Sequence, residues 1–177
     1  MQDNQRQTHW AYVAGVLDAD GCFMISKHSR QAEHKRKWSI VENWCPTYMP
    51  SIKIAMIEFE SIDLVCNEMG FGHYNINGAR KNRPNSKPIY HWYLRGKNNV
   101  IPFLKEVIPY LRVKKKRAEF LLEFSENMKE CTCKGVPIEE FNYREESYVK
   151  MREFNGNKVA ATTKPRRSER ISDSLIS

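Results

Sequence analysis

The chain lacks the features that mark several common classes of protein. Its five cysteines are an odd, scattered set without a Cys-x-x-Cys pair, which argues against a zinc ribbon or a disulfide framework and fits reduced thiols. Glycine and proline are scarce, with eight of each, which excludes a collagen-like or low-complexity chain. The longest apolar run, residues 11–17, is far shorter than the ~20 residues of a membrane span, and no basic-then-apolar signal opens the chain. We therefore expect an intracellular protein without a membrane partner.

Acidic residues are too few to balance the basic ones. Twenty-nine Lys and Arg stand against 21 Asp and Glu, which leaves a formal charge of +8 and a pI of about 9.3. This excess favours a polyanionic partner such as nucleic acid, although charge that only keeps a protein soluble is the alternative. The length of 177 residues, 41% of them hydrophobic, fits one globular domain with its own core.

Hydrophobic periodicity predicts the order of the structural elements. A helix over 9–17, capped by Thr8 and apolar on more than one side, should end at residues 18–21. Alternation predicts strands over 22–27, 51–57, 72–77 and 89–95, and helical spacing predicts helices over 59–69, 99–111, 115–128 and 143–154. An α-β-β-α-β-β core followed by helices predicts an α+β fold with a four-stranded antiparallel sheet and helices on one face.

The composition changes after Phe154. Residues 155–177 are rich in Asn, Gly, Lys, Thr, Arg and Ser and include the basic run 164–167. We expect residues 1–154 to form a single domain and residues 155–177 to form a basic tail that is mobile or ordered by a partner.

Residues 12–21, Tyr-Val-Ala-Gly-Val-Leu-Asp-Ala-Asp-Gly, place small residues in a helix that ends in two carboxylates. Ala14 and Gly15 would let a second helix approach closely. Carboxylates from two paired helices can share divalent cations, whereas the alternative is that Asp18 and Asp20 are only polar turn residues. The segment resembles the signature of the LAGLIDADG homing endonucleases closely, in both residue type and order.

The resemblance extends from about Tyr12 to Phe124 and suggests roles for the end of this helix. It implies that Asp20 is a metal ligand, that Ala19 offers its backbone carbonyl to the metal, and that Asp18 holds the helix end in place. It also implies that the four-stranded sheet is saddle-shaped and binds DNA.

A second motif, Pro-Tyr-Leu-Arg-Val-Lys at 109–114, is similar to a segment of the family's single-motif members. By position it implies that Lys114 is the active-site lysine, whose ammonium would lie near the scissile phosphate. The basic residues that follow, Lys115, Lys116 and Arg117, are then expected to solvate the helix end or to contact backbone phosphates.

One position departs from the family pattern. The family often has a polar residue, commonly Gln, at the end of the second strand, and Glu58 stands there. Glu58 is either a further catalytic carboxylate for metal or water, or a favourable charge at the start of the next helix. No arginine follows within residues 59–61, so Arg95 or Lys97 would have to take that part.

Strand alternation gathers polar and basic side chains on the face opposite the apolar one. A twisted β-ribbon fits the major groove, where such side chains meet base edges, although a merely solvated face is equally compatible with the pattern. The candidates for DNA contact are Ser26, His28, Arg30, Ser51, Lys53, Asn75, Asn77, Arg80, Lys81, His91 and Tyr93 on the two hairpins, with Lys116 on the later helix.

A single copy of the motif supplies only one such helix end. The resemblance therefore implies a homodimer that pairs through Tyr12, Ala14 and Gly15 and cuts both strands of a long, roughly palindromic DNA site with Mg²⁺, leaving 3′ overhangs. Mn²⁺ should also serve, and Ca²⁺ should support binding without cleavage. Such enzymes initiate homing of an intron or similar mobile element, in a mitochondrion or chloroplast if the gene is organellar. A non-cleaving DNA-binding protein or intron RNA maturase of this fold is one alternative, and a basic structural RNA-binding protein is another.

Overall fold

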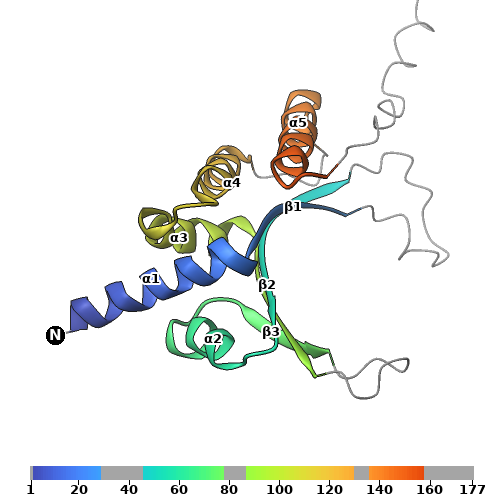
Figure 1. Cartoon of the computed structure of the whole chain (residues 1–177). Helices are drawn as coiled ribbons and strands as arrows, with labels where there is room; N and C mark the ends of the chain where they lie inside the picture. The colour runs from blue at the N-terminus through green and yellow to red at the C-terminus, as the bar shows by residue number, and fades with distance from the viewer. Residues whose placement is uncertain (1, 29–45, 78–86, 130–135, 158–177) are drawn as a thin grey trace, which may run out of the picture.

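The computed structural model describes residues 2–28, 46–77, 87–129 and 136–157 (Figure 1). Its elements follow the predicted order. They are α1 (Gln2–Asp20), β1 (Cys22–His28), β2 (Thr47–Met56), α2 (Glu60–Asp63) with the π-helix η2 (Leu64–Glu68), β3 (His73–Asn77), β4 (Ile89–Arg95), α3 (Lys97–Val107) with the 3₁₀ turn η3 (Ile108–Tyr110), α4 (Lys115–Asn127) and α5 (Ile138–Phe154).

The four strands form one sheet in the order β1-β2-β4-β3, in which every neighbouring pair is antiparallel. Because side chains alternate along a strand, the register assigns each residue to one of two faces. One face, the core face, carries the buried side chains of Phe23, Ile25, Ile52, Ile54, Trp92 and Leu94. The helices gather on that side, and none of the described helices covers the other face, which we call the open face (Figure 1). The predicted α+β fold with helices on one face is confirmed.

The core lies between the core face and the helices. Trp10, Val13 and Leu17 of α1 and Phe103 of α3 are buried, and the Trp10 and Phe103 rings meet edge to face at 5.4 Å between centroids. Burying a large apolar side chain contributes about 1.5–3 kcal/mol. The path of α1 across the sheet is therefore fixed by its inward side, which in turn fixes where its C-terminal end lies.

Several element boundaries differ from the sequence prediction. The helix that Thr8 was expected to cap begins six residues earlier, at Gln2, and the Thr8 hydroxyl instead donates to the Asn4 carbonyl at 2.8 Å inside the helix. The single helix predicted over 59–69 is a short α-helix followed by a π-helical turn. The strand predicted from residue 51 starts at Thr47, and the helix predicted from residue 143 starts at Ile138, directly after Pro137.

Helix α5 is fastened to the first hairpin by a partly buried polar cluster. The Lys27 ammonium donates to both carboxylate oxygens of Glu145, at 2.8 and 2.6 Å, and the Tyr48 hydroxyl donates to the same carboxylate. The Asn155 amide, just past α5, donates to the Phe23 carbonyl at 2.8 Å.

Among the described helices, none is long and apolar enough to cross a membrane.

Candidate functional site

The C-terminal end of α1 is held by Asp18. Its carboxylate accepts hydrogen bonds from the backbone N–H groups of Arg112, Val113 and Lys114, at 2.8, 3.2 and 2.8 Å. Partial burial raises the pKa of Asp18, but these three donors and the Lys114 ammonium outweigh that effect and leave the pKa below its ordinary value. The expectation that Asp18 holds the helix end is confirmed.

Lys114 reaches back under the same helix end. Its ammonium donates to the carbonyls of Leu17, Ala19 and Gly21, at 3.0, 2.9 and 2.8 Å, which places a cation at the negative end of the helix dipole. The Leu17 carbonyl also accepts from the Gly21 N–H at 3.0 Å. Burial and the nearby Arg117 lower the pKa of Lys114, against the raising effect of the surrounding acidic groups. The Ala19 carbonyl, which the resemblance implied as a metal ligand, thus accepts a hydrogen bond from Lys114.

Asp20, two residues beyond Asp18, has a different environment. Its side chain is exposed, and within the described residues it has no hydrogen bond and no ion pair. A solvated carboxylate at the end of a rigid helix suits a hard divalent cation, which prefers oxygen ligands. The described part of the chain contains no group of three or more His, Cys, Asp or Glu side chains that could hold a metal. Among the described residues, Asp20 is thus a fitting ligand without a complete metal site around it.

Glu58 is exposed and follows directly after β2. It makes no capping hydrogen bond to α2, whose N-cap residue is Phe59, but it directly precedes that residue, so its alternative role as a favourable charge near the start of the helix stays a prediction. Its predicted role as a further carboxylate for metal or water stays a prediction. Of the two proposed arginine substitutes, Arg95 lies on the open face, whereas the Lys97 ammonium donates to the Met128 carbonyl at 3.4 Å.

The open face of the sheet carries most of the predicted DNA contacts. The strand register places these side chains on it: Ser26, His28, Ser51, Lys53, Asn75, Asn77, His91 and Tyr93. Ser51 is an exception in accessibility, because it is only 3% exposed and its hydroxyl lies 2.9 Å from the Ser26 hydroxyl, so the expectation that it reaches a base is corrected. Lys116 is exposed on α4, and Arg30, Arg80 and Lys81 lie outside the described residues.

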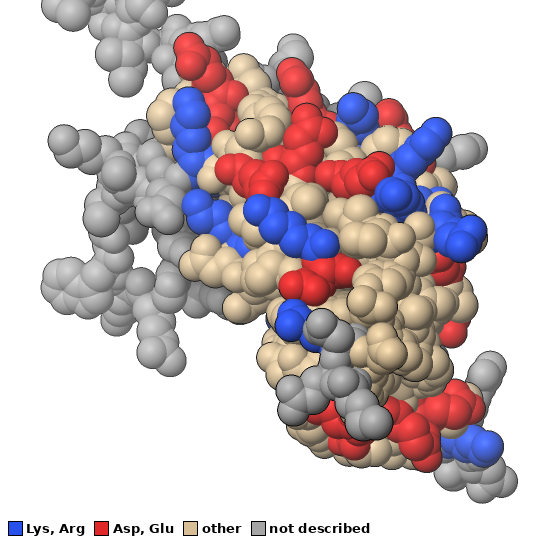
Figure 2. Space-filling view, turned by 90° about the vertical axis from the view of Figure 1, so that its left-hand side faces the viewer, with Lys and Arg blue, Asp and Glu red and all other residues tan. Residues whose placement is uncertain are grey.

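The open face contains no carboxylate. Along the four described strands, none of the residues that face this way is Asp or Glu. On the helical side, acidic and basic side chains are interspersed (Figure 2). His73 was not among the predicted DNA contacts, and Arg95 was predicted only as a substitute for the missing arginine, although each lies two residues from a predicted contact and strand alternation alone would have found it.

The outward side of α1 is largely bare. Tyr12 is 50% exposed, with its hydroxyl 2.6 Å from that of Ser61, and a Cβ atom built on the exposed Gly15 would meet nothing within 4 Å. Ala14, in contrast, is 0% exposed because it packs into the core of its own chain. Its predicted place in a dimer interface is therefore corrected, whereas Tyr12 and Gly15 remain accessible to a partner.

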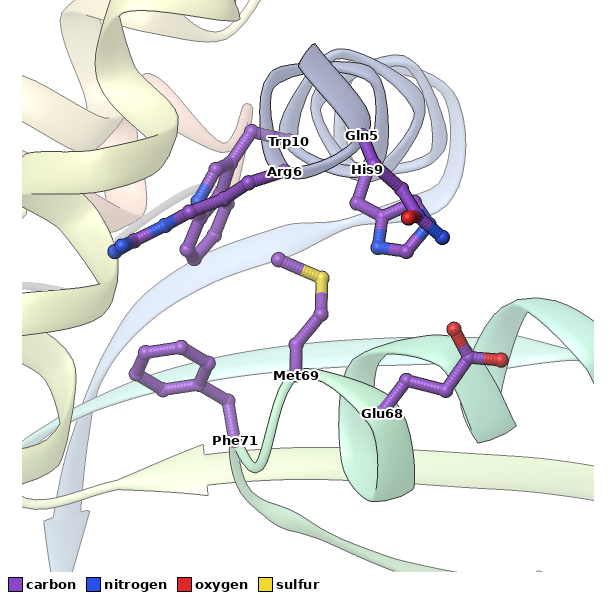
Figure 3. A pocket seen from close by; sticks show the side chains of 7 residues that line it. All are labelled: Gln5, Arg6, His9, Trp10, Glu68, Met69 and Phe71. Carbon is purple, nitrogen blue, oxygen red and sulfur yellow. The ribbon is translucent and has the colours of Figure 1, made fainter. Parts of the chain in front are cut away.

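The residues expected to act in chemistry do not line a deep pocket. A cavity of about 320 Å³ lies between the N-terminal half of α1 and the end of η2, where Met69 points between Trp10 and His9 (Figure 3). Arg6, which also lines it, is paired with Glu106 at 3.1 Å. The candidate site is therefore an exposed helix end beside an open sheet face, as expected for a large partner rather than a small molecule.

Solved structures show where else this fold occurs. The archaeal intron-encoded homing endonuclease I-Vdi141I, solved in complex with DNA, is 14% identical and matches 92% of this chain and 91% of its own with a TM-score of 0.63. The homing endonuclease I-CvuI, solved with a DNA target, is 15% identical over 88% of this chain and 99% of its own, with a TM-score of 0.53. The LAGLIDADG homing endonuclease I-LtrWI, bound to target DNA, is 18% identical, with a TM-score of 0.54 over 78% of this chain and 42% of its own.

No protein-family model and no curated protein matches the chain. The similarity to the solved structures therefore shows that the chain has the fold of the LAGLIDADG homing endonucleases. It spans nearly the whole I-CvuI chain but less than half of the I-LtrWI chain, so it supplies one unit where the longer chain has room for two.

Proposed function

We propose that the chain is a site-specific DNA endonuclease that acts as a homodimer and makes a double-strand break in a long, roughly palindromic site, for homing of an intron or similar mobile element. The observation that carries the proposal is Asp20, an exposed carboxylate without a hydrogen bond or ion pair in the described chain, at the end of a helix whose outward side is bare at Gly15. The shared fold with endonucleases solved on DNA supports it.

The homodimer is proposed because the described residues of one chain hold a single metal ligand. Asp20 is a single ligand, and the described residues provide no cluster that could hold a metal alone. Pairing the outward sides of two α1 helices through Tyr12 and Gly15 would bring two Asp20 carboxylates together on a twofold axis. A divalent cation held there, Mg²⁺ or Mn²⁺, would supply activation of water and stabilisation of the leaving oxygen.

The chain's own residues would organise the reaction around that axis. Asp20 would hold the cation with its carboxylate, and Asp18 and Lys114 would keep the helix end rigid through their bonds to residues 112–114 and to the three carbonyls. The open face, rich in donors and free of carboxylates, would bind the major groove of each half-site. Hydrolysis joins a water oxygen to phosphorus while one phosphoester bond breaks, once in each strand.

The test starts from wild-type protein and a pool of duplexes with randomised sequence. Selected sites should be long and roughly palindromic, and a plasmid that carries one should become linear with Mg²⁺ or Mn²⁺, stay intact with EDTA, and be bound uncut with Ca²⁺. Sedimentation should give a dimer on DNA. A chain that stays monomeric at micromolar concentration, both free and on its selected site, would contradict the paired helix ends.

A second candidate is a DNA-binding protein or intron RNA maturase of the same fold that does not cleave. It is favoured by the position of the Lys114 ammonium, which is engaged by three carbonyls rather than directed to solvent. Tight, sequence-specific binding without any product in Mg²⁺ or Mn²⁺ would support the non-cleaving binder. Preference for a folded RNA over every selected duplex would support the maturase.

A further inference from the structure

The centre of the open face holds an unusual cluster of side chains around Tyr93. The Arg95 guanidinium lies 4.6 Å and the Lys53 ammonium 5.4 Å from the centroid of the Tyr93 ring. His73 and His91 stack against the same ring at 5.9 and 6.2 Å, with interplanar angles of 28° and 24°. Three strands thus contribute to one flat platform with two cations on it, which we call the Tyr93 cluster.

Within the described part of the chain, neither cation of the Tyr93 cluster is neutralised. No carboxylate within the described residues forms an ion pair with Lys53 or Arg95, and the strands offer none on that face. Cation–ring contacts hold a long side chain in place without using up its hydrogen-bond donors. Both side chains are therefore held over the Tyr93 ring in advance and keep their donors available.

The position of the Tyr93 cluster on the sheet indicates whether its side chains contact bases or phosphates. Lys53 of β2 is the cross-strand partner of Cys22 of β1, two residues after Asp20, and Arg95 of β4 pairs with Ser51 of β2. In a β-ribbon that lies in the major groove, the middle of the face meets base edges and the margins meet the sugar–phosphate backbone. Backbone spacing puts Lys53 within about 12 Å of Asp20, or about four base-pair steps.

We propose that Arg95 and Lys53, held on the Tyr93 ring, read guanine in the base pairs next to the cleavage position of each half-site. This inference rests on the proposed function. Guanine presents two acceptors, O6 and N7, on its major-groove edge, and Arg and Lys are the side chains that pair with them. Tyr93 is a positioning residue in this arrangement, because it holds the two cations rather than contacting a base.

The first test uses wild-type protein, so it does not depend on the folding of any variant. Sites selected from randomised duplexes should contain guanine within about four base pairs of each cleavage position, symmetrically in both half-sites. Replacing that guanine by 7-deazaguanine, which keeps base pairing but lacks the N7 acceptor, should weaken binding in Ca²⁺ about tenfold. Inner positions without a guanine preference, or full affinity for the 7-deaza duplex, would overturn the inference.

The second test assigns the contact to its residue. Arg95→Met should bind the guanine and the 7-deaza duplex equally, and Lys53→Met should lose preference at a neighbouring position. Arg152→Met is the matched control, because the Arg152 guanidinium also lies over a tyrosine, 5.8 Å from the Tyr148 ring, but on α5. It should leave both preferences unchanged. An equal loss of affinity for every sequence with Arg95→Met or Lys53→Met would identify phosphate contacts and refute base reading.

Substitutions of Tyr93 test its positioning role through base discrimination, measured separately from affinity. Tyr93→Leu should reduce the discrimination between guanine and the other bases more than it reduces affinity for random DNA, and Tyr93→Phe, which keeps the ring, should restore it. A Tyr93→Phe variant as undiscriminating as Tyr93→Leu would overturn the positioning role. Wild-type protein that fails to bind any duplex would instead refute the proposed function, so the two failures differ.

Discussion

In two regions of the sheet a lysine ammonium lies near a tyrosine ring, but the lysine has a different role in each. On the core face, Lys27 lies 5.5 Å from the Tyr48 ring and 5.4 Å from the Tyr148 ring, and its ammonium bonds to Glu145. On the open face, Lys53 lies 5.4 Å from the Tyr93 ring and has no carboxylate partner among the described residues. A tyrosine thus holds each lysine, but only the first is neutralised. A cation that has a carboxylate partner in the chain stabilises the fold, whereas a cation that has none is available to bind a polyanion.

The end of α1 repeats this difference with the signs reversed. Asp18 accepts three backbone N–H groups and fastens the helix, whereas Asp20, two residues later, is exposed and accepts none in the described chain. Substitution of a charged group whose hydrogen-bond partners lie in the same chain should therefore lower the stability of the fold. Charged groups without an internal partner should affect DNA cleavage or binding.

The largest expected effect is on cleavage. Asp20→Asn keeps the size of the side chain but removes the charge that would hold the cation, so single-turnover cleavage should fall by roughly a thousandfold or more. Binding in Ca²⁺ should survive, because affinity comes mainly from basic side chains. Gel shift and single-turnover assays on one selected target measure both. An Asp20→Asn variant that cuts at the wild-type rate would sink the mechanism.

Asp18→Asn is the matched control for that change. It should cost about 2 kcal/mol of stability, on the scale of lost hydrogen bonds to a charged group. Because the folded pKa of Asp18 is lowered, its ionised form stabilises the fold above about pH 4, and this contribution is lost as the pH falls through the folded pKa. The stability gap between wild type and Asp18→Asn in urea should therefore close in acid, and a gap independent of pH would contradict this account.

The two lysines should separate by stability. Lys27→Met leaves the Glu145 carboxylate without its cation and should cost about 2 kcal/mol, less than the loss of a fully buried pair because both side chains are 22% exposed. Lys53→Met should stay within about 0.5 kcal/mol of wild type, as for other surface changes. Urea unfolding of both variants measures the difference. Equal losses would remove the distinction between the two faces.

The two sides of α1 allow the same comparison with small residues. Ala14→Leu should overpack the core and cost about 1–3 kcal/mol, because Ala14 is fully buried. A Cβ atom added at the exposed Gly15 would meet nothing within 4 Å, so Gly15→Leu should leave the fold intact while it separates the protomers. Sedimentation and thermal unfolding distinguish the outcomes, with Glu119→Leu on exposed α4 as a control. A fully dimeric Gly15→Leu variant would place the interface elsewhere.

Much of this arrangement could be predicted from the sequence, since it depends on local patterns. Strand alternation placed Lys53 and Tyr93 on one face. The α-β-β-α-β-β order followed from periodicity in the same way. These two features need only neighbours in the chain, and the structure confirms both. The metal-binding role of Asp20 was implied by the resemblance of its segment to a family signature and stays a prediction.

The rest depends on contacts between segments far apart in the chain. That Ala14 faces inward and Gly15 outward is decided by packing against the sheet, not by their size. The engagement of Lys114 by three carbonyls more than ninety residues away carries no local signal. Ser51 alternates correctly but is buried by its neighbours. The sequence pattern assigns a residue to one face of a strand or helix, whereas tertiary packing decides whether that residue is accessible.

The smallest expected effect is on the salt dependence of binding, and it compares two lysines two residues apart. Lys116 is exposed on the first turn of α4, whereas the Lys114 ammonium points into the carbonyls at the end of α1. If Lys116 contacts a phosphate, Lys116→Met should reduce the slope of log affinity against log salt by about 0.9, with little change in stability. Lys114→Met should leave the slope unchanged, slow cleavage, and lower stability by about 1 kcal/mol through the lost helix-end bonds. Gel shifts at several salt concentrations, beside thermal unfolding, give both quantities. Equal slopes for the two variants would show that the internal hydrogen bonds of Lys114 do not distinguish it from Lys116. The distinction between cations that stabilise the fold and cations that bind DNA would then fail at this helix.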